Sequence, residues 1–300
     1  MENKHLIVLA GPTASGKTAT AIKLAKAFDA EIISADSRQF YKELSIGTAA
    51  PTAEDLAQVK HHFVHNLSIE DKYDVADYKK DILSYLKEYF KTHNVAVMTG
   101  GSGLFIDAVC NGLDEIPDIS DEIRAKVTKM LEVGGLEALQ KEVEKVDNDY
   151  FQIVDKQNPR RLQRALEVYY QTGRPYSTFR QGNAVKRDFN IIKLAILWDR
   201  YKLIERINKR VDMMMQQGLL DEVRSVYPKR HLNSLNTVGY KELFDYLDGK
   251  CTLEQAVEQI KINTRQYAKR QMTWLRKNND YQWFTIEETD VIIKSLECRV

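Results

Sequence analysis

The stretch GPTASGKT at residues 11–18 decides the fold, because it is a complete GxxxxGK[ST] phosphate-binding loop in fitting surroundings. The apolar run LIVLA at residues 6–10 precedes it and is typical of a buried parallel strand, while residues 18–28 follow with helical spacing of apolar side chains. Such a loop binds anions, since free N–H groups and the positive end of the helix dipole face one point. We expect Lys17 to reach the terminal phosphates and Thr18 to hold Mg²⁺. The residues expected to bind phosphate are Gly11, Pro12, Thr13, Ala14, Ser15, Gly16, Lys17 and Thr18.

Composition argues against a membrane-spanning, secreted or zinc-stabilised protein. The chain has 300 residues, of which 43% are hydrophobic, and this is enough for the core of one large domain or two smaller ones. No apolar run approaches the ~20 residues of a membrane span, and the N-terminal apolar stretch is too short for a signal peptide. The cysteines Cys110, Cys251 and Cys298 are far apart and form no CxxC pair. We therefore expect a cytoplasmic protein without membrane contact or structural zinc.

Strands and helices alternate in the first third of the chain. Residues 31–36 (EIISAD) and 94–99 (NVAVMT) are typical of strands, and residues 75–90 form an amphipathic helical pattern between them. This alternation predicts an α/β fold with a parallel sheet, whose ligands bind at the carboxyl ends of the strands. The phosphate loop, Asp36 and the GGSG segment at residues 100–103 should therefore share one crevice.

A helical insertion is predicted after this first part. Residues 116–190 show helical patterns and no strand, and residues 191–197 (IIKLAIL) are typical of a strand that returns to the sheet. We predict a P-loop catalytic core at residues 1–115 plus 191–300, and an all-helical insertion domain at residues 116–190. The remaining helices are expected at residues 201–217, 219–227, 240–247 and 253–277.

Asp36 is the main candidate for a catalytic group. It follows a strand beside the phosphate site, so it suits a general base, a Mg²⁺ ligand like that of a Walker B strand, or a capping residue for the turn at Ser37. The strand at residues 94–99 ends in Thr99 and Gly100 rather than in a pair of acids, which disfavours a motor ATPase. The GGSG segment offers N–H groups and a hydroxyl, or forms a plain tight turn. Three histidines, His61, His62 and His65, have loose spacing, which favours packing or substrate contact over a metal.

Positive charge gathers in two segments. Residues 259–279 contain six basic residues and no acid, and four of the six follow at spacings of 4, 4 and 7, which places them on one helical face. A one-sided cationic stripe favours a polyanion such as nucleic acid, although a solvated helix face is the alternative. A second cluster lies in the insertion, so two segments are expected to grip one nucleic acid. The residues are Lys261, Arg265, Lys269, Arg270, Arg276 and Lys277, and then Lys156, Arg160, Arg161 and Arg164.

The chain resembles the bacterial tRNA dimethylallyltransferase family over nearly its whole length. The phosphate loop alone is a weak signal, but its combination with the other motifs is highly specific. The matching segments are GPTASGKT at Gly11, ISADSRQFY at Ile33, IGTAAPT at Ile46, TGGSGLF at Thr99, NPRRLQRALEVY at Asn158, TGRP at Thr172, VGYKEL at Val238 and TRQYAKRQMTWLR at Thr264. Ser102 and Phe105 stand where the family usually has Thr and Tyr, and Ala50 where it commonly has Lys.

The resemblance implies an activity and a set of partners. It implies transfer of a dimethylallyl group from dimethylallyl diphosphate to N6 of adenosine 37, in the anticodon stem-loop of tRNAs that read codons beginning with U. It also implies Mg²⁺ as a helper and no ATP. We expect the protein to be a monomer. By matching position, Asp36 is the general base, and an Arg of the Arg206 to Arg210 helix reaches the diphosphate. The implied catalytic residues are Asp36, Lys17, Thr18, Ser102 and Arg206.

The resemblance also marks segments that contact tRNA. They comprise the turn after the second strand, part of the insertion, the NTVGY stretch and the basic C-terminal helix. The implied residues are Asp36, Ser37, Arg38, Gln39, Ser102, Arg124, Arg160, Arg161, Leu162, Gln163, Arg164, Gly239, Tyr240, Arg265, Lys269, Arg270, Gln271, Trp274 and Arg276.

Three other functions remain open at this stage. A small-molecule kinase explains the phosphate loop, Asp36 and Mg²⁺, but not the two cationic segments. A nucleotide-gated RNA-binding protein would bind RNA without transferring any group. Prenylation of free adenine nucleotides is disfavoured by the long insertion and the basic C-terminal region, which suit a macromolecular acceptor.

Overall fold

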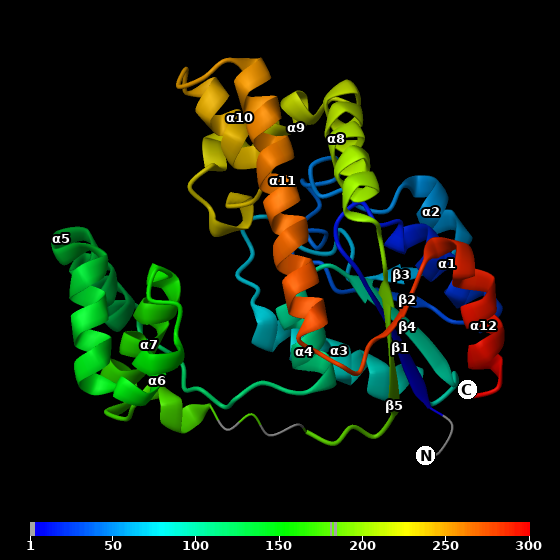
Figure 1. Cartoon of the computed structure of the whole chain (residues 1–300), viewed down its shortest axis with the longest axis horizontal. Helices are drawn as coiled ribbons and strands as arrows, with labels where there is room; N and C mark the ends of the chain where they lie inside the picture. The colour runs from blue at the N-terminus through cyan, green and yellow to red at the C-terminus, as the bar shows by residue number, and fades with distance from the viewer. Residues whose placement is uncertain (1–3, 181, 183–184) are drawn as a thin grey trace. The chain divides into compact units, whose positions relative to one another are not determined.

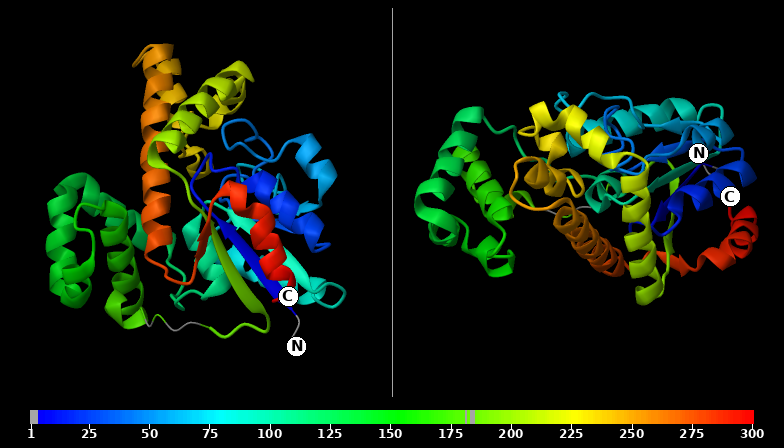
Figure 2. Two further views of the ribbon diagram at one scale, coloured as in Figure 1. Left: turned by 45° about the vertical axis from the view of Figure 1, so that its right-hand side comes forward. Right: turned by 90° about the horizontal axis from the view of Figure 1, so that it is seen from above.

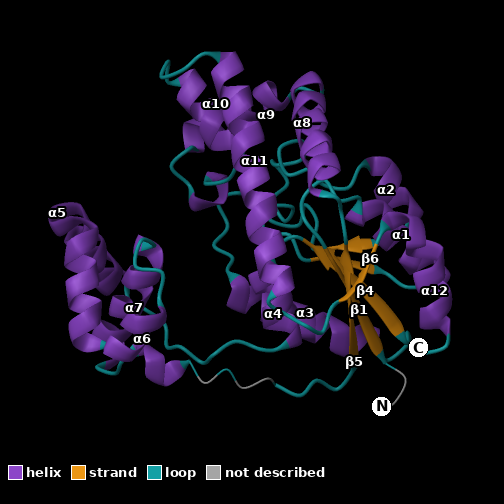
Figure 3. Ribbon diagram, in the orientation of Figure 1, coloured by secondary structure: helices purple, strands orange, loops and turns teal. Residues whose placement is uncertain are grey.

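Six parallel strands form one sheet in the computed structural model, which describes residues 4–180, 182 and 185–300. The strand order is β3-β2-β4-β1-β5-β6, and every pair of neighbouring strands is parallel. Figure 3 shows the strands in orange with helices on both faces. The predicted α/β fold class is therefore confirmed. The strands are β1 (His5–Ala10), β2 (Ile32–Ser34), β3 (His61–His62), β4 (Val95–Gly100), β5 (Asn190–Ile196) and β6 (Gln282–Phe284).

The helices begin at residues that suit helix starts. Asp74, Asp199 and Thr252 accept hydrogen bonds from N–H groups in the first turns of α3, α8 and α11, which satisfies donors that otherwise lack a partner. The α-helices are α1 (Lys17–Ala27), α2 (Ala53–Gln58), α3 (Val75–Tyr89), α4 (Gly103–Cys110), α5 (Asp121–Val146), α6 (Asn148–Ile153), α7 (Pro159–Thr172), α8 (Arg200–Gln216), α9 (Leu219–Val226), α10 (Tyr240–Leu247), α11 (Leu253–Arg276) and α12 (Thr289–Glu297).

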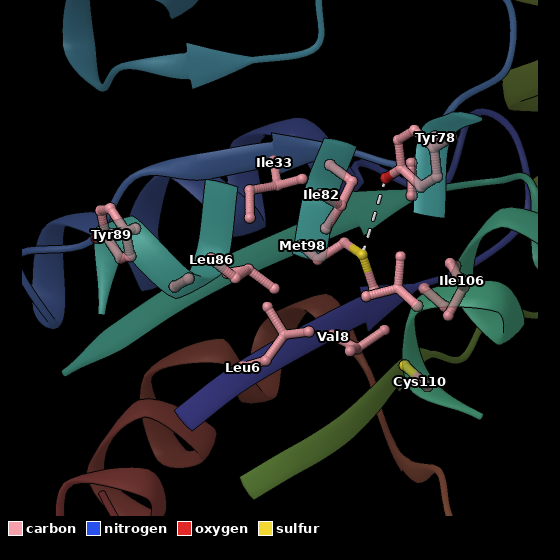
Figure 4. Close-up of a cluster of buried hydrophobic side chains, with 14 of the residues drawn as sticks. Leu6, Val8, Ile33, Tyr78, Ile82, Leu86, Tyr89, Met98, Ile106 and Cys110 are labelled. Carbon is pink, nitrogen blue, oxygen red and sulfur yellow. Dashed lines mark hydrogen bonds between the residues drawn. The ribbon is translucent and has the colours of Figure 1, made fainter. Parts of the chain in front are cut away.

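The sheet buries both of its faces, as a parallel sheet does when helices cover it. Successive side chains of β1 alternate: Leu6 and Val8 pack with α3 and α4, whereas Ile7 and Leu9 pack with α1 and α12. Figure 4 shows the first of these clusters, where the Tyr78 side chain also lies against β2. Its hydroxyl donates a hydrogen bond to the Ser34 carbonyl at 2.8 Å, at the end of β2 where the site begins.

Helices α8–α11 form a separate helical layer beyond the carboxyl ends of the strands (Figures 1 and 2). Their buried side chains, among them Val211, Val223 and Ile260, pack with Tyr41 and Leu44 from the segment that follows β2. These helices therefore stand where an α/β sheet binds its ligands.

The chain divides into two compact units, Met1–Cys110 with Lys186–Val300 and Asn111–Val185. The second unit contains α5, α6 and α7, and no strand among its described residues. Its core includes Val127, Leu139 and Leu162. Nowhere in the described ranges is there a helix with both the length and the apolar character needed to cross a bilayer.

Candidate active site

The phosphate loop ends in a backbone conformation that opens the N-terminus of α1. Gly16 is the residue before α1 and has φ of 84°, in the left-handed region that favours glycine. No side chain caps this helix, so its first N–H groups are available to an anion. An added Cβ at Gly16 would lie 2.8 Å from Cδ1 of Ile286, so the position also lacks space.

A cavity of about 490 Å³ lies beside this loop. The cavity brings together the phosphate loop, Asp36 and the glycines at the end of β4, as the order of strand ends predicts. Side chains from α8 and α11 complete the wall. The lining residues are Thr13, Ala14, Ser15, Gly16, Lys17, Thr18, Asp36, Gln39, Thr48, Ala49, Thr99, Gly100, Gly101, Arg206, Lys209, Arg210, Met213, Tyr267 and Gln271.

Lys17 lies at the base of the cavity, and its Nζ donates a hydrogen bond to the Pro12 carbonyl at 2.7 Å. Burial and the positive charge of Arg210 lower the pKa of Lys17 to about 7, and only the Asp36 carboxylate opposes them. Among the described residues, Lys17, Arg206, Lys209 and Arg210 thus line the cavity with a single carboxylate, Asp36, which makes the cavity electropositive.

Asp36 uses one of its two carboxylate oxygens in the turn after β2. Oδ1 accepts a hydrogen bond from the Arg38 N–H at 3.0 Å, which is the capping role considered from the sequence. In the described part of the chain, Oδ2 has no hydrogen-bond donor, and Asp36 lines the cavity. The capping role and a chemical role are therefore compatible, because each needs a different oxygen.

Two arginines on successive turns of α8 reach the phosphate loop. Arg206 donates from Nε to the Ala14 carbonyl at 2.9 Å, and its guanidinium stacks 4.6 Å from the centre of the Trp198 ring. Arg210 donates from Nη1 to Thr13 Oγ1 at 3.3 Å, and burial lowers its pKa. The sequence left open which of these two arginines contacts the diphosphate; both line the cavity and lie four residues apart on one face of α8.

The glycine segment after β4 is closely packed against the Asp36 turn. An added Cβ at Gly100 would lie 2.1 Å from the Ala35 carbonyl oxygen. Ser102 Oγ accepts from the Ser37 N–H at 3.0 Å and lies 3.3 Å from Ser37 Oγ. Ser102 does not line the cavity, so in this structure its hydroxyl holds the turn that carries Asp36.

Gln271 of α11 joins the two loops on either side of the cavity. Its Oε1 accepts from the Thr13 N–H at 2.8 Å, and its Nε2 donates to the Gly101 carbonyl at 2.9 Å. One turn further along, Trp274 donates from Nε1 to Asp107 at 2.8 Å. Both residues were expected to contact tRNA, but these side-chain groups are engaged within the protein.

The basic residues of α11 fall into two groups: those in the N-terminal half have partners within the protein, and those in the C-terminal half are exposed. Lys261 lies 2.6 Å from Asp212, and Arg265 contacts Asn208 at 2.9 Å and Glu258 at 3.2 Å. At the N-terminal half of the predicted stripe, α8 and an acid two turns earlier on α11 therefore supply partners for the basic side chains. The exposed basic residues are Lys269, Arg270, Arg276 and Lys277.

Other residues assigned to tRNA contact differ in exposure. Leu162 and Tyr240 are fully buried, so their side chains pack in the two cores rather than face a ligand. Gly239 precedes α10 with φ of 96°, and Arg38 donates to the carbonyls of Asn233 and Ser234. In the second unit Arg124, Arg160 and Arg161 are exposed, whereas Gln163 and Arg164 are partly buried.

The histidines have ordinary structural partners. His62 Nε2 lies 2.5 Å from Glu31 Oε2 and 2.9 Å from the Tyr85 hydroxyl. His61 contacts the Val59 carbonyl through Nδ1. In the ranges that the structure covers, no three His, Cys, Asp or Glu side chains are grouped to hold a metal ion.

In sequence, the chain is similar to enzymes that transfer an isopentenyl or dimethylallyl group to tRNA. Residues 39–278 match the family described as IPP transferase. The chain is 49% identical over 286 residues to the tRNA dimethylallyltransferase of Christiangramia forsetii, with 95% of each chain covered. It is 46% identical over 300 residues to tRNA dimethylallyltransferase 1 of Bacteroides fragilis, with both chains fully covered.

Solved structures of tRNA isopentenylpyrophosphate and dimethylallyl transferases also superpose on this chain. The full-length tRNA isopentenylpyrophosphate transferase of Bacillus halodurans superposes with a TM-score of 0.73 at 33% identity, covering 99% of this chain and 96% of the other. A eukaryotic dimethylallyltransferase acting on tRNA superposes with a TM-score of 0.76 at 26% identity, covering 91% of this chain and 70% of the other.

Proposed function

This chain belongs to the IPP transferase family, and from this premise we propose that it transfers a dimethylallyl group from dimethylallyl diphosphate to tRNA. The acceptor in the proposal is N6 of adenosine 37 in tRNAs that read codons beginning with U. One observation carries the chemistry: Asp36, whose Oδ2 accepts no hydrogen bond from the described residues, lines the same cavity as Lys17 and Arg210. A carboxylate that can accept a proton and cations that can stabilise a diphosphate are thus within one site.

The leaving group is stabilised at the phosphate-loop end of the cavity. The C–O bond between the dimethylallyl carbon and the diphosphate breaks, and negative charge develops on the diphosphate oxygens. Loop N–H groups, Lys17, Arg206 and Arg210 favour that charge, because fixed donors and cations need little rearrangement as it develops. This arrangement supports departure of diphosphate without a protein nucleophile.

The amine is deprotonated by Asp36 in the same cavity. As N6 of the adenine forms the new C–N bond, its proton passes to Oδ2 of Asp36, which acts as general base. The Arg38 N–H bond to Oδ1 and the Ser102 bond to Ser37 fix the orientation of this carboxylate. The adenine must leave the stack of the anticodon loop to reach it, which is a base-flipping step.

The cavity also suits Mg²⁺ on the diphosphate. The Thr18 hydroxyl and the Asp36 carboxylate would supply oxygen ligands, since both residues line the cavity. Mg²⁺ commonly binds through one or two protein ligands together with phosphate oxygens and water, so a larger acidic cluster is not needed. When bound, the ion would neutralise charge on the leaving group.

The tRNA is recognised, in this proposal, by exposed cations on each unit. Lys269, Arg270 and Arg276 on α11 would contact backbone phosphates, and so would Arg160 and Arg161 in the second unit. Buried or paired residues, such as Tyr240 and Lys261, are left out of this set.

Asp36→Asn tests the proposal, because the amide keeps an oxygen for the Arg38 N–H but is a poor base. With labelled dimethylallyl diphosphate, Mg²⁺ and bacterial tRNA, the variant should lose at least ~10²-fold in kcat and keep its affinity for tRNA. Asp290→Asn, at an exposed position of α12, is the matched control and should transfer at the wild-type rate.

Label recovered as N6-isopentenyladenosine from the wild type would support donor, acceptor and reaction together. An equal loss of tRNA affinity in Asp36→Asn would contradict the role of general base. ATP consumption by the wild type, with no label in tRNA, would refute the transferase and favour a kinase.

A further inference from the structure

Glu222 on α9 accepts four hydrogen bonds, although it lies outside the cavity. Its Oε2 accepts from the N–H groups of Ser45 at 2.9 Å and Ile46 at 2.8 Å. Its Oε1 accepts from the Gly47 N–H at 2.9 Å and from the Tyr240 hydroxyl at 2.6 Å. Three successive N–H groups directed at one carboxylate form an anion-binding concavity, here filled by a residue of the protein itself.

The same loop is packed against the Tyr240 ring. An added Cβ at Gly47 would lie 2.5 Å from Cε2 of Tyr240, so the backbone of Gly47 rests directly on the ring. Tyr240 is fully buried, which leaves its hydroxyl directed at Glu222. Gly47 and Tyr240 belong to the IGTAAPT and VGYKEL motifs, so this packing joins two of the motifs quoted above.

The loop continues directly into the wall of the cavity. Thr48 and Ala49 line the cavity, and their carbonyls accept from Gln39 Nε2 at 3.3 and 3.2 Å. Gln39 lies in the turn of Asp36, since its N–H donates to the Asp36 carbonyl at 3.2 Å. Glu222 therefore fixes one end of a loop whose other end is tied to the turn of the proposed base.

We propose that Glu222 is a positioning residue for the transfer reaction. Through residues 45–47 it holds Thr48 and Ala49 as the wall that keeps the donor aligned with the acceptor. This inference rests on the proposed function, because the alignment matters only if two substrates react in the cavity. Rate is sensitive to such alignment, since reacting atoms must be held within a narrow range of geometries.

Glu222→Gln is the direct test, because the side chain keeps its size while one oxygen becomes an amide NH₂ that cannot accept. Two N–H or O–H donors then lose their acceptor. Amide hydrogen exchange in residues 45–49 should become about 10-fold faster or more, and kcat should fall about 10-fold, since one oxygen's hydrogen bonds are lost. The KM for tRNA should stay within about twofold, because no exposed cation is altered.

Glu43→Gln is the matched control. Glu43 also accepts bonds from a loop, from the Ser68 hydroxyl at 2.9 Å and the Ile69 N–H at 3.1 Å, but that loop does not line the cavity. Glu43→Gln should make the loop at Ser68 and Ile69 more mobile and leave kcat unchanged. If Glu222→Gln fails to fold, Tyr240→Phe removes one donor, keeps the ring on Gly47, and should lower kcat about threefold with faster exchange in residues 45–49.

The outcomes separate the two proposals. A wild-type protein that labels no tRNA would refute the proposed function itself. Wild-type transfer together with an unchanged kcat in Glu222→Gln would overturn the role of Glu222 alone. Equal losses of kcat in Glu222→Gln and Glu43→Gln would show a general effect of destabilisation and would overturn it as well.

Discussion

Binding of dimethylallyl diphosphate should draw a proton onto Lys17. Burial and the nearby Arg210 guanidinium lower the pKa of this ammonium from 10.5 to about 7 in the free protein. A diphosphate beside Lys17 adds negative charge next to the ammonium, and an adjacent anion favours the protonated form. The pKa should therefore rise on binding, and the complex should hold more protons than its separated components.

The size of the uptake follows from the pKa. With a pKa of about 7, roughly 0.1 of the Lys17 side chains are protonated at pH 8 and roughly 0.9 at pH 6. Full protonation in the complex then means an uptake of about 0.9 proton at pH 8 and about 0.1 at pH 6. The uptake increases with pH, and any proton that the diphosphate itself loses on binding lowers the value at pH 6 further.

Isothermal titration calorimetry measures this uptake directly. The donor is titrated without tRNA, at constant Mg²⁺, in buffers of different ionisation enthalpy, and the slope of the observed enthalpy gives the number of protons. Lys17→Met is the control and should show no uptake at either pH. An uptake at pH 8 that is no larger than at pH 6, or that persists in Lys17→Met, would refute the reasoning.

Two further predictions concern the packing of Gly100 against Ala35 and the basic residues of α11 that are proposed to bind tRNA. Gly100→Ala should lower the free energy of unfolding by about 1–3 kcal/mol in urea denaturation, because the new Cβ meets the Ala35 carbonyl oxygen; an unchanged midpoint would contradict the tight packing. Lys269→Gln should weaken tRNA binding and reduce the salt slope by about 0.7–0.9, whereas Lys261→Gln should change the slope less, because Asp212 already pairs with Lys261. Fluorescence anisotropy over a salt series measures both slopes, and equal changes would argue against the division of the α11 cations.

Long apolar strands were predictable, and short edge strands were not. The apolar runs of β1, β4 and β5 identify them, since a parallel strand buried on both faces needs such a run. β3 and β6 contain two and three residues, and they form at the edges of the sheet through pairing with β2 and β5. Sequence reasoning took the region after β5 as wholly helical and so missed β6.

The site was predictable where a local motif fixes the chemistry. The phosphate loop and Asp36 lie at strand ends, and the order of the chain brings them together. The choice between Arg206 and Arg210 stayed open, because it depends on how α8 is rotated against the phosphate loop. The pairing of Lys261 with Asp212 joins two helices, and only the packed structure brings them together.

The cavity is assembled from both ends of the chain, and this affects the nascent protein. The phosphate loop is made first and the glycines after β4 next, but Arg206, Arg210 and Gln271 come much later. Until translation has passed α11, the Thr13 N–H and the Gly101 carbonyl lack the side chain that joins them. β6 then completes the sheet edge beside β5. A ribosome-bound chain can therefore form most of the sheet before the cavity is complete. A product truncated before α11 would contain the phosphate loop but not the part of the cavity that α11 lines.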